Sequence, residues 1–250
     1  MFLHKRTLEM LKELVQIFES YGIRYCAVGG TLLGAYTSHK FIPWDEDIDI
    51  AVFEEDYDRM IDILIEKIPQ NMICQCNKTE PKYYHEWIKV RDKGSVILPK
   101  SDSNYLEEGV WIDIYKLQRI KRKHIDLKRA EGHKKYLLRR LEVGNITEKE
   151  YKARVKQNKL NKRIFMERIR SLFLFDNKYG YLIGTASKPF VDEEYVFPLK
   201  EYKFEDMYIT SFNKASQYLL NHYGKEYMNL PPENERYISI SGVKYNLSQK

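Results

Sequence analysis

Two aspartates, Asp47 and Asp49, alternate with the large apolar residues Ile48 and Ile50. Residues two apart on a strand point to the same side, so the aspartates would share one face while the isoleucines enter the core. Neighbouring carboxylates repel each other unless a cation lies between them, and such oxygen ligands suit Mg²⁺ or Mn²⁺. A solvated acidic turn is the other interpretation. The interleaving with isoleucine, rather than with Ser, Gly or Lys, favours a metal site.

A third acid, Asp113, lies inside the apolar run 109–115. An aspartate within a strand is disfavoured by propensity and costly to bury, so something must compensate for it. A metal ion shared with the first two aspartates would do so. An edge-strand position, or a salt bridge to Lys89 or Arg91, would serve equally well, and the residues alone leave these alternatives open.

Two sets of residues could contact phosphate. Gly29 and Gly30 stand between a predicted strand and a predicted helix, where backbone N–H groups approach an anion closely and Thr31 adds a hydroxyl. A simple tight turn is the alternative for the glycine pair. Lys89 and Arg91, two apart on a predicted strand, would face the same way and could both bind phosphate, unless they are merely exposed strand cations.

The apolar spacing around these residues alternates between strands and helices. Strands are predicted over residues 23–28, 48–53, 83–90, 95–98 and 110–117, and helices over 31–36, 57–68 and 214–223, after an amphipathic N-terminal helix. Together these elements predict a mixed sheet flanked by helices, an α+β (mixed α/β) fold.

The composition is typical of a soluble globular protein, with 43% hydrophobic and 31% charged residues among 250. No run approaches the roughly 18 to 20 apolar residues that span a bilayer, and the N-terminal helix carries charges that a signal peptide lacks. Cys26, Cys74 and Cys76 are odd in number and predict neither a disulfide framework nor a zinc cluster. We therefore expect a cytoplasmic protein.

Positive charge is concentrated between residues 121 and 170, where 18 Lys and Arg stand against 6 Asp and Glu, a local balance of +12. Apolar spacing predicts two helices here, broken near residues 144–146, with Thr147 as an N-cap. A solvated helical face, peripheral contact with an anionic membrane, and nucleic-acid binding would each explain the charge. No nucleic-acid-binding motif accompanies it, so we expect no nucleic acid as a partner.

The order of these motifs resembles one known family. A glycine pair, a helix, two aspartates on the next strand and a later third carboxylate look like the nucleotidyltransferase superfamily. Within it, GGTLLGAYTSHKFIPWDEDIDI, followed by IKVRDK, VWIDI, FPLK and YGKEYMNLPP, is similar to the LicD/fukutin family. The resemblance implies a nucleotidyltransferase-like catalytic core over residues 1–117 and 175–250, with a basic helical insertion over 118–174.

Such proteins are understood as phosphotransferases that move a phosphorylated alcohol, such as phosphocholine, from a CDP-linked donor such as CDP-choline to a sugar hydroxyl. The resemblance implies that Asp47, Asp49 and Asp113 bind Mg²⁺ or Mn²⁺, and that Asp45 is a further ligand or a general base. It also implies that the glycine pair and the hydroxyl beside it approach the donor phosphates. The acceptor would be a glycan or lipid-linked sugar, which favours a place near the inner face of the membrane.

The sequence departs from the family pattern at Thr37, Ser38, Lys40 and Glu46. These changes leave the three acids intact, but donor and acceptor specificity do not follow from the resemblance through this loop. A nucleotidyltransferase that transfers a nucleoside monophosphate could use the same acids. A non-catalytic glycan- or nucleotide-binding protein is disfavoured because all three acids are present.

Overall fold

A mixed sheet forms the centre of the computed structural model, which describes residues 2–98, 108–176, 178–184, 190–229, 232–233, 236, 240 and 242–245. Five strands pair in the order β1, β2, β6, β4, β3, while β7 pairs with the distal half of β6 and β8 with β7. β2 and β6 run parallel, whereas the other neighbours are antiparallel. The strands are β1 (Tyr25–Ala27), β2 (Ile48–Phe53), β3 (Met72–Gln75), β4 (Ile88–Asp92), β6 (Trp111–Lys121), β7 (Tyr179–Ile183) and β8 (Phe190–Asp192).

Three helices from the first third of the chain pack on this sheet: α1 (Phe2–Tyr21), α2 (Gly29–Thr37) and α3 (Glu54–Lys67). Each contributes fully buried side chains to one continuous core, for example Leu14, Leu32 and Leu64. The predicted strand 48–53 and the helices around it are confirmed, so the sheet and its helices establish the α+β class. This part of the fold brings β2 beside β6 and places the start of α2 against β2.

The C-terminal third adds smaller elements around the same core. The hairpin of β9 (Lys200–Phe204) and β10 (Met207–Ser211) lies between α7 (Glu193–Val196) and α8 (Ala215–Tyr223) in the chain. β11 (Gly242–Tyr245) pairs with β5 (Ser95–Leu98). The predicted helix at 214–223 is confirmed as α8, and Gly224 follows it with a positive φ of 83°, a conformation that glycine adopts without strain.

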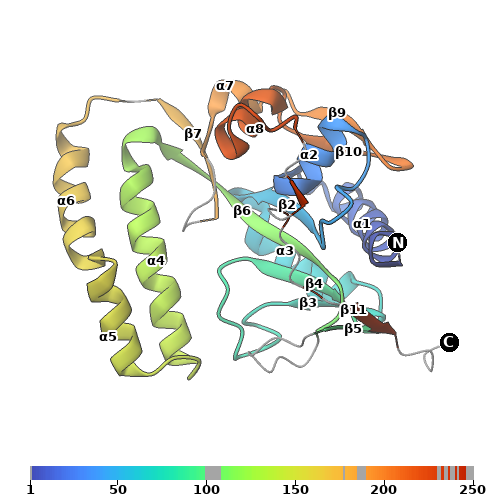
Figure 1. Cartoon of the computed structure of the whole chain (residues 1–250), viewed down its shortest axis with the longest axis horizontal. Coiled ribbons are helices and arrows are strands. Elements are labelled where there is room, and N and C mark those ends of the chain that lie inside the picture. The colour runs from blue at the N-terminus through green and yellow to red at the C-terminus, as the bar shows by residue number, and fades with distance from the viewer. Residues whose placement is uncertain are drawn as a thin grey trace.

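The basic segment forms a helical addition beside the sheet (Figure 1). After the short 3₁₀ helix η1 (Arg122–His124) come α4 (Ile125–Glu142), α5 (Glu148–Gln157) and α6 (Leu160–Phe173). These helices have a small apolar cluster of their own, made of Leu137, Ile146, Val155 and Leu160. Among the described residues, no helix is long and apolar enough to cross a membrane.

Two sequence predictions were wrong in detail. The second basic helix is in fact two helices, α5 and α6, because Lys159 adopts a left-handed conformation with φ 49° that interrupts the helix. Thr147 caps α5 as predicted, in a reciprocal capping box with Glu150. The strand predicted over 83–90 begins only at Ile88, because the Tyr83 hydroxyl instead donates to the Trp87 carbonyl in an irregular aromatic segment.

Candidate active site

The three aspartates singled out in the sequence converge at the ends of two adjacent strands. Asp47 lies just before β2, Asp49 lies on β2, and Asp113 lies on β6. Asp49 and Asp113 are register partners in the parallel pair. One carboxylate oxygen from each of the three lies within 4.8 Å of the others, an arrangement that could hold a metal ion. An all-oxygen donor set of this kind fits Mg²⁺ or Mn²⁺.

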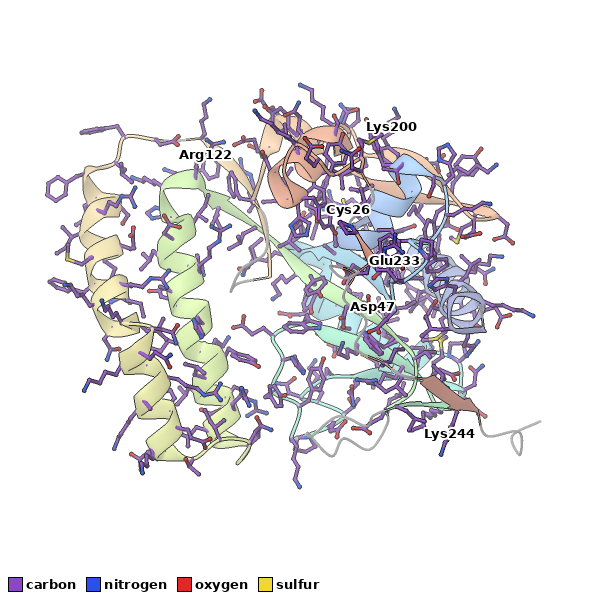
Figure 2. All side chains as sticks on the ribbon, viewed as in Figure 1. Cys26, Asp47, Arg122, Lys200, Glu233 and Lys244 are labelled. Carbon is purple, nitrogen blue, oxygen red and sulfur yellow. The ribbon has the colours of Figure 1, made fainter. Side chains whose placement is uncertain are left out.

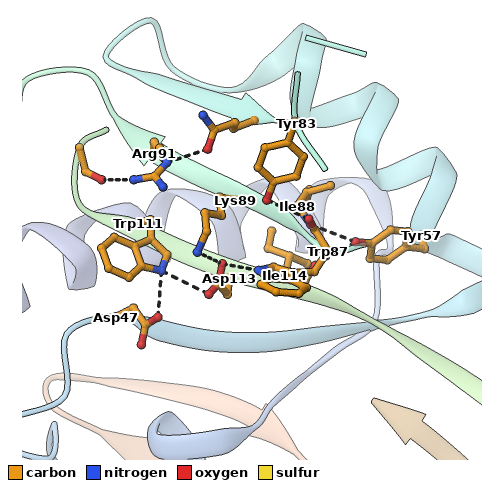
Figure 3. A network of polar contacts seen from close by, with 12 residues as sticks. Asp47, Tyr57, Tyr83, Trp87, Ile88, Lys89, Arg91, Trp111, Asp113 and Ile114 are labelled. Atoms are coloured by element: carbon orange, nitrogen blue, oxygen red, sulfur yellow. Dashed lines mark hydrogen bonds and ion pairs between the residues drawn. The ribbon is translucent and has the colours of Figure 1, made fainter. Parts of the chain in front are cut away.

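Two indoles and a lysine surround Asp113 (Figure 3). Trp111 Nε1 donates to Asp47 Oδ2 at 2.8 Å and to Asp113 Oδ2 at 3.2 Å, so one indole bridges two acids. Trp87 Nε1 donates to Asp113 Oδ1 at 2.9 Å, and Lys89 Nζ donates to the same oxygen at 2.6 Å. Both oxygens of Asp113 are therefore committed to hydrogen bonds within the protein.

Sequence reasoning missed both tryptophans. Trp111 stands two residues before Asp113 on β6, and Trp87 stands two residues before Lys89 at the start of β4. The period of two that placed the aspartates on one face would have placed the indoles there as well. Indole N–H groups are donors only, so they suit a cluster of carboxylates.

Crowding of the carboxylates alters their proton affinity. Burial, followed by repulsion from Asp49 and Asp113, raises the pKa of Asp47 well above its usual range, although Lys89 and the indole of Trp111 oppose this shift. Burial, followed by the charge of Asp47, raises the pKa of Asp45 to about 7. A cation bound between these carboxylates would offset their repulsion and stabilise their ionised forms.

The glycine pair at the start of α2 lies directly against two carboxylates. A Cβ on Gly29 would stand 2.3 Å from Asp49 Oδ2, and a Cβ on Gly30 would stand 2.0 Å from Asp45 Oδ2. Gly29 also has a φ of +56°. The pair therefore does more than form a tight turn, because it makes room for acids of the site.

The start of α2 makes two hydrogen bonds with other parts of the chain. The Gly29 N–H donates to the Tyr218 hydroxyl at 2.9 Å, and Thr31 Oγ1 accepts the Asp49 N–H at 2.9 Å. The Gly30 and Thr31 N–H groups also belong to the first turn of α2, where a helix supplies no acceptor of its own. Of the residues predicted to cradle phosphate, Gly30 and Thr31 therefore have N–H groups better placed for it than Gly29.

Lys89 and Arg91 face the same side of β4, as their spacing predicts, and both lie over the ring of Trp111. Lys89 contacts the acid cluster through Asp113. Arg91 is buried, and its guanidinium donates to Gln75 Oε1 and to the Gly109 carbonyl, both at 2.7 Å. The salt bridge considered for Asp113 is thus formed by Lys89, and Arg91 ties β3 to the segment before β6.

A cleft of about 410 Å³ lies beside the acid cluster, between α3, α4 and the segment before β4. Trp87 lines this cleft and also donates to Asp113, so it links the two. Aromatic residues dominate one wall and charged residues from α4 the other: Tyr57, Tyr83, Tyr84, His85, Lys135 and Arg139. No local sequence pattern predicted this cleft, because its two walls come from distant segments.

A cluster of acids on adjacent strands, beside a glycine pair that opens a helix, defines a nucleotidyltransferase-like site. Residues 22–141 match the family model described as LicD/FKTN/FKRP, nucleotidyltransferase domain. The chain is 26% identical over 249 residues to the lipopolysaccharide cholinephosphotransferase LicD of Haemophilus influenzae, covering 92% of this chain and 91% of that protein. These two matches support the LicD/fukutin family of phosphotransferases for this chain.

A second relative is named for a different activity. Human ribitol 5-phosphate transferase FKRP is 27% identical over 103 residues, which cover 41% of this chain and 19% of that protein. The corresponding mouse protein is 42% identical over 48 residues, covering 19% of this chain and 10% of that protein. These matches are confined to part of the chain, whereas the bacterial relative aligns over nearly all of it.

Proposed function

We propose that this protein is a metal-dependent phosphotransferase that moves a phosphorylated alcohol, phosphocholine or a similar group, from a CDP-linked donor to a sugar hydroxyl of a glycan precursor. The observation that carries the proposal is the convergence of Asp47, Asp49 and Asp113, with carboxylate oxygens within 4.8 Å of one another. The activities for which the bacterial and human relatives are named support transfer of cholinephosphate or ribitol 5-phosphate as the reaction type.

Asp47, Asp49 and Asp113 would hold Mg²⁺ or Mn²⁺. Such an ion, when bound, neutralises charge on the phosphoryl oxygens during in-line displacement. The donor phosphates would lie at the start of α2, against the N–H groups of Gly30 and Thr31 and the positive end of the helix dipole. Lys89, predicted from the sequence as a phosphate ligand, would instead act as a positioning residue, because its ammonium group is paired with Asp113.

In the proposed reaction, the acceptor hydroxyl forms a new oxygen–phosphorus bond as the bond from that phosphorus to CMP breaks. The acceptor proton must pass to a base, for which Asp45 and Asp113 are the candidates. Asp113 already accepts hydrogen bonds on both oxygens. Asp45 is the better choice because its Oδ2 lies against the backbone of Gly30, at the proposed phosphate position.

We place the acceptor sugar at the cleft beside the acids, because Trp87 belongs to both. Aromatic walls with a few charged groups suit a sugar, which has apolar faces and polar edges. Replacing Tyr84 with alanine should raise the KM for the acceptor while leaving donor binding unchanged. An unchanged acceptor KM would remove the cleft from this proposal without affecting the role of the acids.

The products distinguish this reaction from nucleotidyl transfer, which the same acids could support. CDP-choline, CDP-ribitol and CDP-glycerol would be incubated with Mg²⁺ and a glycan acceptor, with label placed on either half of the donor. The proposal expects CMP release and label transfer from the alcohol half, lost in Asp49→Asn but kept in Asp206→Asn, whose carboxylate is exposed and lies outside the cleft. Transfer of a nucleoside monophosphate from a triphosphate, with release of pyrophosphate, would overturn it.

A further inference from the structure

α6 presents a row of large apolar side chains to solvent, although it belongs to the most basic part of the chain. Its inner side is marked by the buried residues Leu160 and Ser171, and α6 packs against α4. The outer side chains are between 40% and 93% exposed and continue just past the helix end. They are Phe165, Met166, Ile169, Leu172, Phe173 and Phe175, and we call them the α6 apolar row.

The row follows the geometry of the helix. At about 100° per residue, its five helical members fall within an arc of about 120°. An arc this wide is the apolar stripe with which an amphipathic helix normally faces a core, but here it faces away from the rest of the protein. α6 is the helix farthest from the sheet, and its side chains project outward at the edge of the molecule (Figures 1 and 2).

Cations border the α6 apolar row. The same helical geometry places Arg168 on one side of it and Arg163 and Arg170 on the other, while Lys162 falls within the arc near the start of the helix. α6 as a whole has these four cations and one acid, Glu167. Arg168 contacts Glu131 at 2.8 Å, and Arg170 lies 3.7 Å from Asp126. These ion pairs are exposed and therefore weak, so lipid phosphates could replace Glu131 and Asp126 as partners of the two arginines.

We propose that α6 docks this protein on an anionic lipid surface, with the α6 apolar row inserted between the headgroups and the flanking arginines on lipid phosphates. An amphipathic helix with bulky apolar residues on one side and cations beside them is the kind that lies in a bilayer interface. With 14 residues, α6 is about 21 Å long, shorter than the hydrocarbon core of about 30 Å, so it lies in the interface rather than across it.

Charge argues against a second copy of the chain as the occupant. Residues 121–170 have a balance of +12, so two such faces would repel each other, whereas anionic lipid attracts them. This docking is independent of the proposed transfer reaction, because α6 contributes none of the acids of the site.

The test is sedimentation of the full chain with phosphatidylcholine vesicles, with and without phosphatidylglycerol. We expect binding only with the anionic lipid and weakening by salt. Leu172→Ser combined with Phe173→Ser should lower the partition coefficient about tenfold or more, because two large apolar side chains are lost. The matched control is Tyr208→Ser, an exposed aromatic on β10, which should bind as the wild type does.

A charge variant gives a second measurement. Lys162→Glu with Arg163→Glu should weaken binding, whereas the exposed Lys203→Glu should not. All variants should keep the wild-type circular dichroism and Mg²⁺-dependent donor binding, because these side chains are exposed. Equal binding to both vesicle types, no vesicle binding, or a concentration-dependent dimer abolished by the serine variant would each overturn the proposal.

Discussion

Asp49 and Asp113 are register partners on the parallel strands β2 and β6, and Lys89 is the register partner of Asp113 on the other side, in β4. Three adjacent strands thus present two carboxylates and one ammonium group in a row. Lys89 neutralises part of the charge, and its Nζ lies 2.6 Å from Asp113 Oδ1. The negative charge that remains on the carboxylates is what a bound cation would neutralise.

Replacing Lys89 with methionine should destabilise the metal-free protein by about 3 kcal/mol, because a buried carboxylate loses its partner. Mg²⁺ should restore more of the free energy of unfolding in this variant than in the wild type, since the cation then replaces the lost ammonium charge. Urea denaturation with and without Mg²⁺ measures both effects.

Lys116→Met is the matched control for that variant. Its ammonium group lies 3.4 Å from the exposed carboxylate of Asp58, and such a pair contributes less than about 1 kcal/mol. A similar loss of stability in both variants would show that the ion pair of Lys89 and Asp113 contributes no more to stability than an exposed pair does. An unchanged response of Lys89→Met to Mg²⁺ would contradict the proposed cation position.

Three alanine substitutions separate backbone strain from crowding at the acids. Gly22 has a φ of +63° and open space around it, so Gly22→Ala should cost only the strain of about 1 to 2 kcal/mol. Gly29→Ala has similar strain and also pushes on Asp49. Gly30 does not have a positive φ, so Gly30→Ala adds no backbone strain. The fold should remain stable while the new Cβ displaces Asp45.

Thermal unfolding and donor binding together test this series. Donor binding should survive Gly22→Ala and be lost in Gly29→Ala. Gly30→Ala should lose at least about tenfold in turnover, because a displacement of about 1 Å in a catalytic group costs more than that. Wild-type turnover in Gly30→Ala would show that the position of Asp45 is unimportant.

His85 should make the metal-free protein less stable in acid. Burial, followed by the charge of Lys89, lowers the pKa of His85 from 6.5 to about 3. Between these values the unfolded chain binds more protons than the folded one, so the stabilisation is complete above pH 6.5 and is lost as the pH falls toward 3.

The slope for one such group is about 1.4 kcal/mol per pH unit. In His85→Asn, the free energy of unfolding should therefore fall less steeply with acid than in the wild type, by up to this amount. Urea denaturation at several pH values between 6.5 and 4, in the presence of a chelator, measures the difference. Parallel curves for the two proteins would contradict the prediction.

Patterns with a fixed period made much of this molecule predictable. The alternation around Asp47 and Asp49 predicted β2 to the residue, and the capping signal at Thr147 gave the start of α5. The helix break at Lys159 was missed because a left-handed lysine has no marker in the sequence.

The site was only partly predictable for a similar reason. The spacing of residues along the chain predicted which side chains share a face of a strand, but it did not predict which strands pair. The contacts of Lys89 with Asp113, and of Arg91 with Gln75, depend on the antiparallel pairing of β4 with β6 and β3. Tyr218 reaches Gly29 from α8, far along the chain, and no local pattern predicts such a contact.

The central claim is that Asp47, Asp49 and Asp113 hold a divalent cation that the donor needs. Calorimetric titration of the wild type, Asp49→Asn and Asp58→Asn with Mn²⁺, and then with CDP-choline and CDP-ribitol, tests it most directly. The account predicts one strong Mn²⁺ site or a coupled pair in the wild type and Asp58→Asn, with donor binding that requires the metal, and neither event in Asp49→Asn. Metal-independent donor binding, or unchanged Mn²⁺ binding by Asp49→Asn, would contradict it.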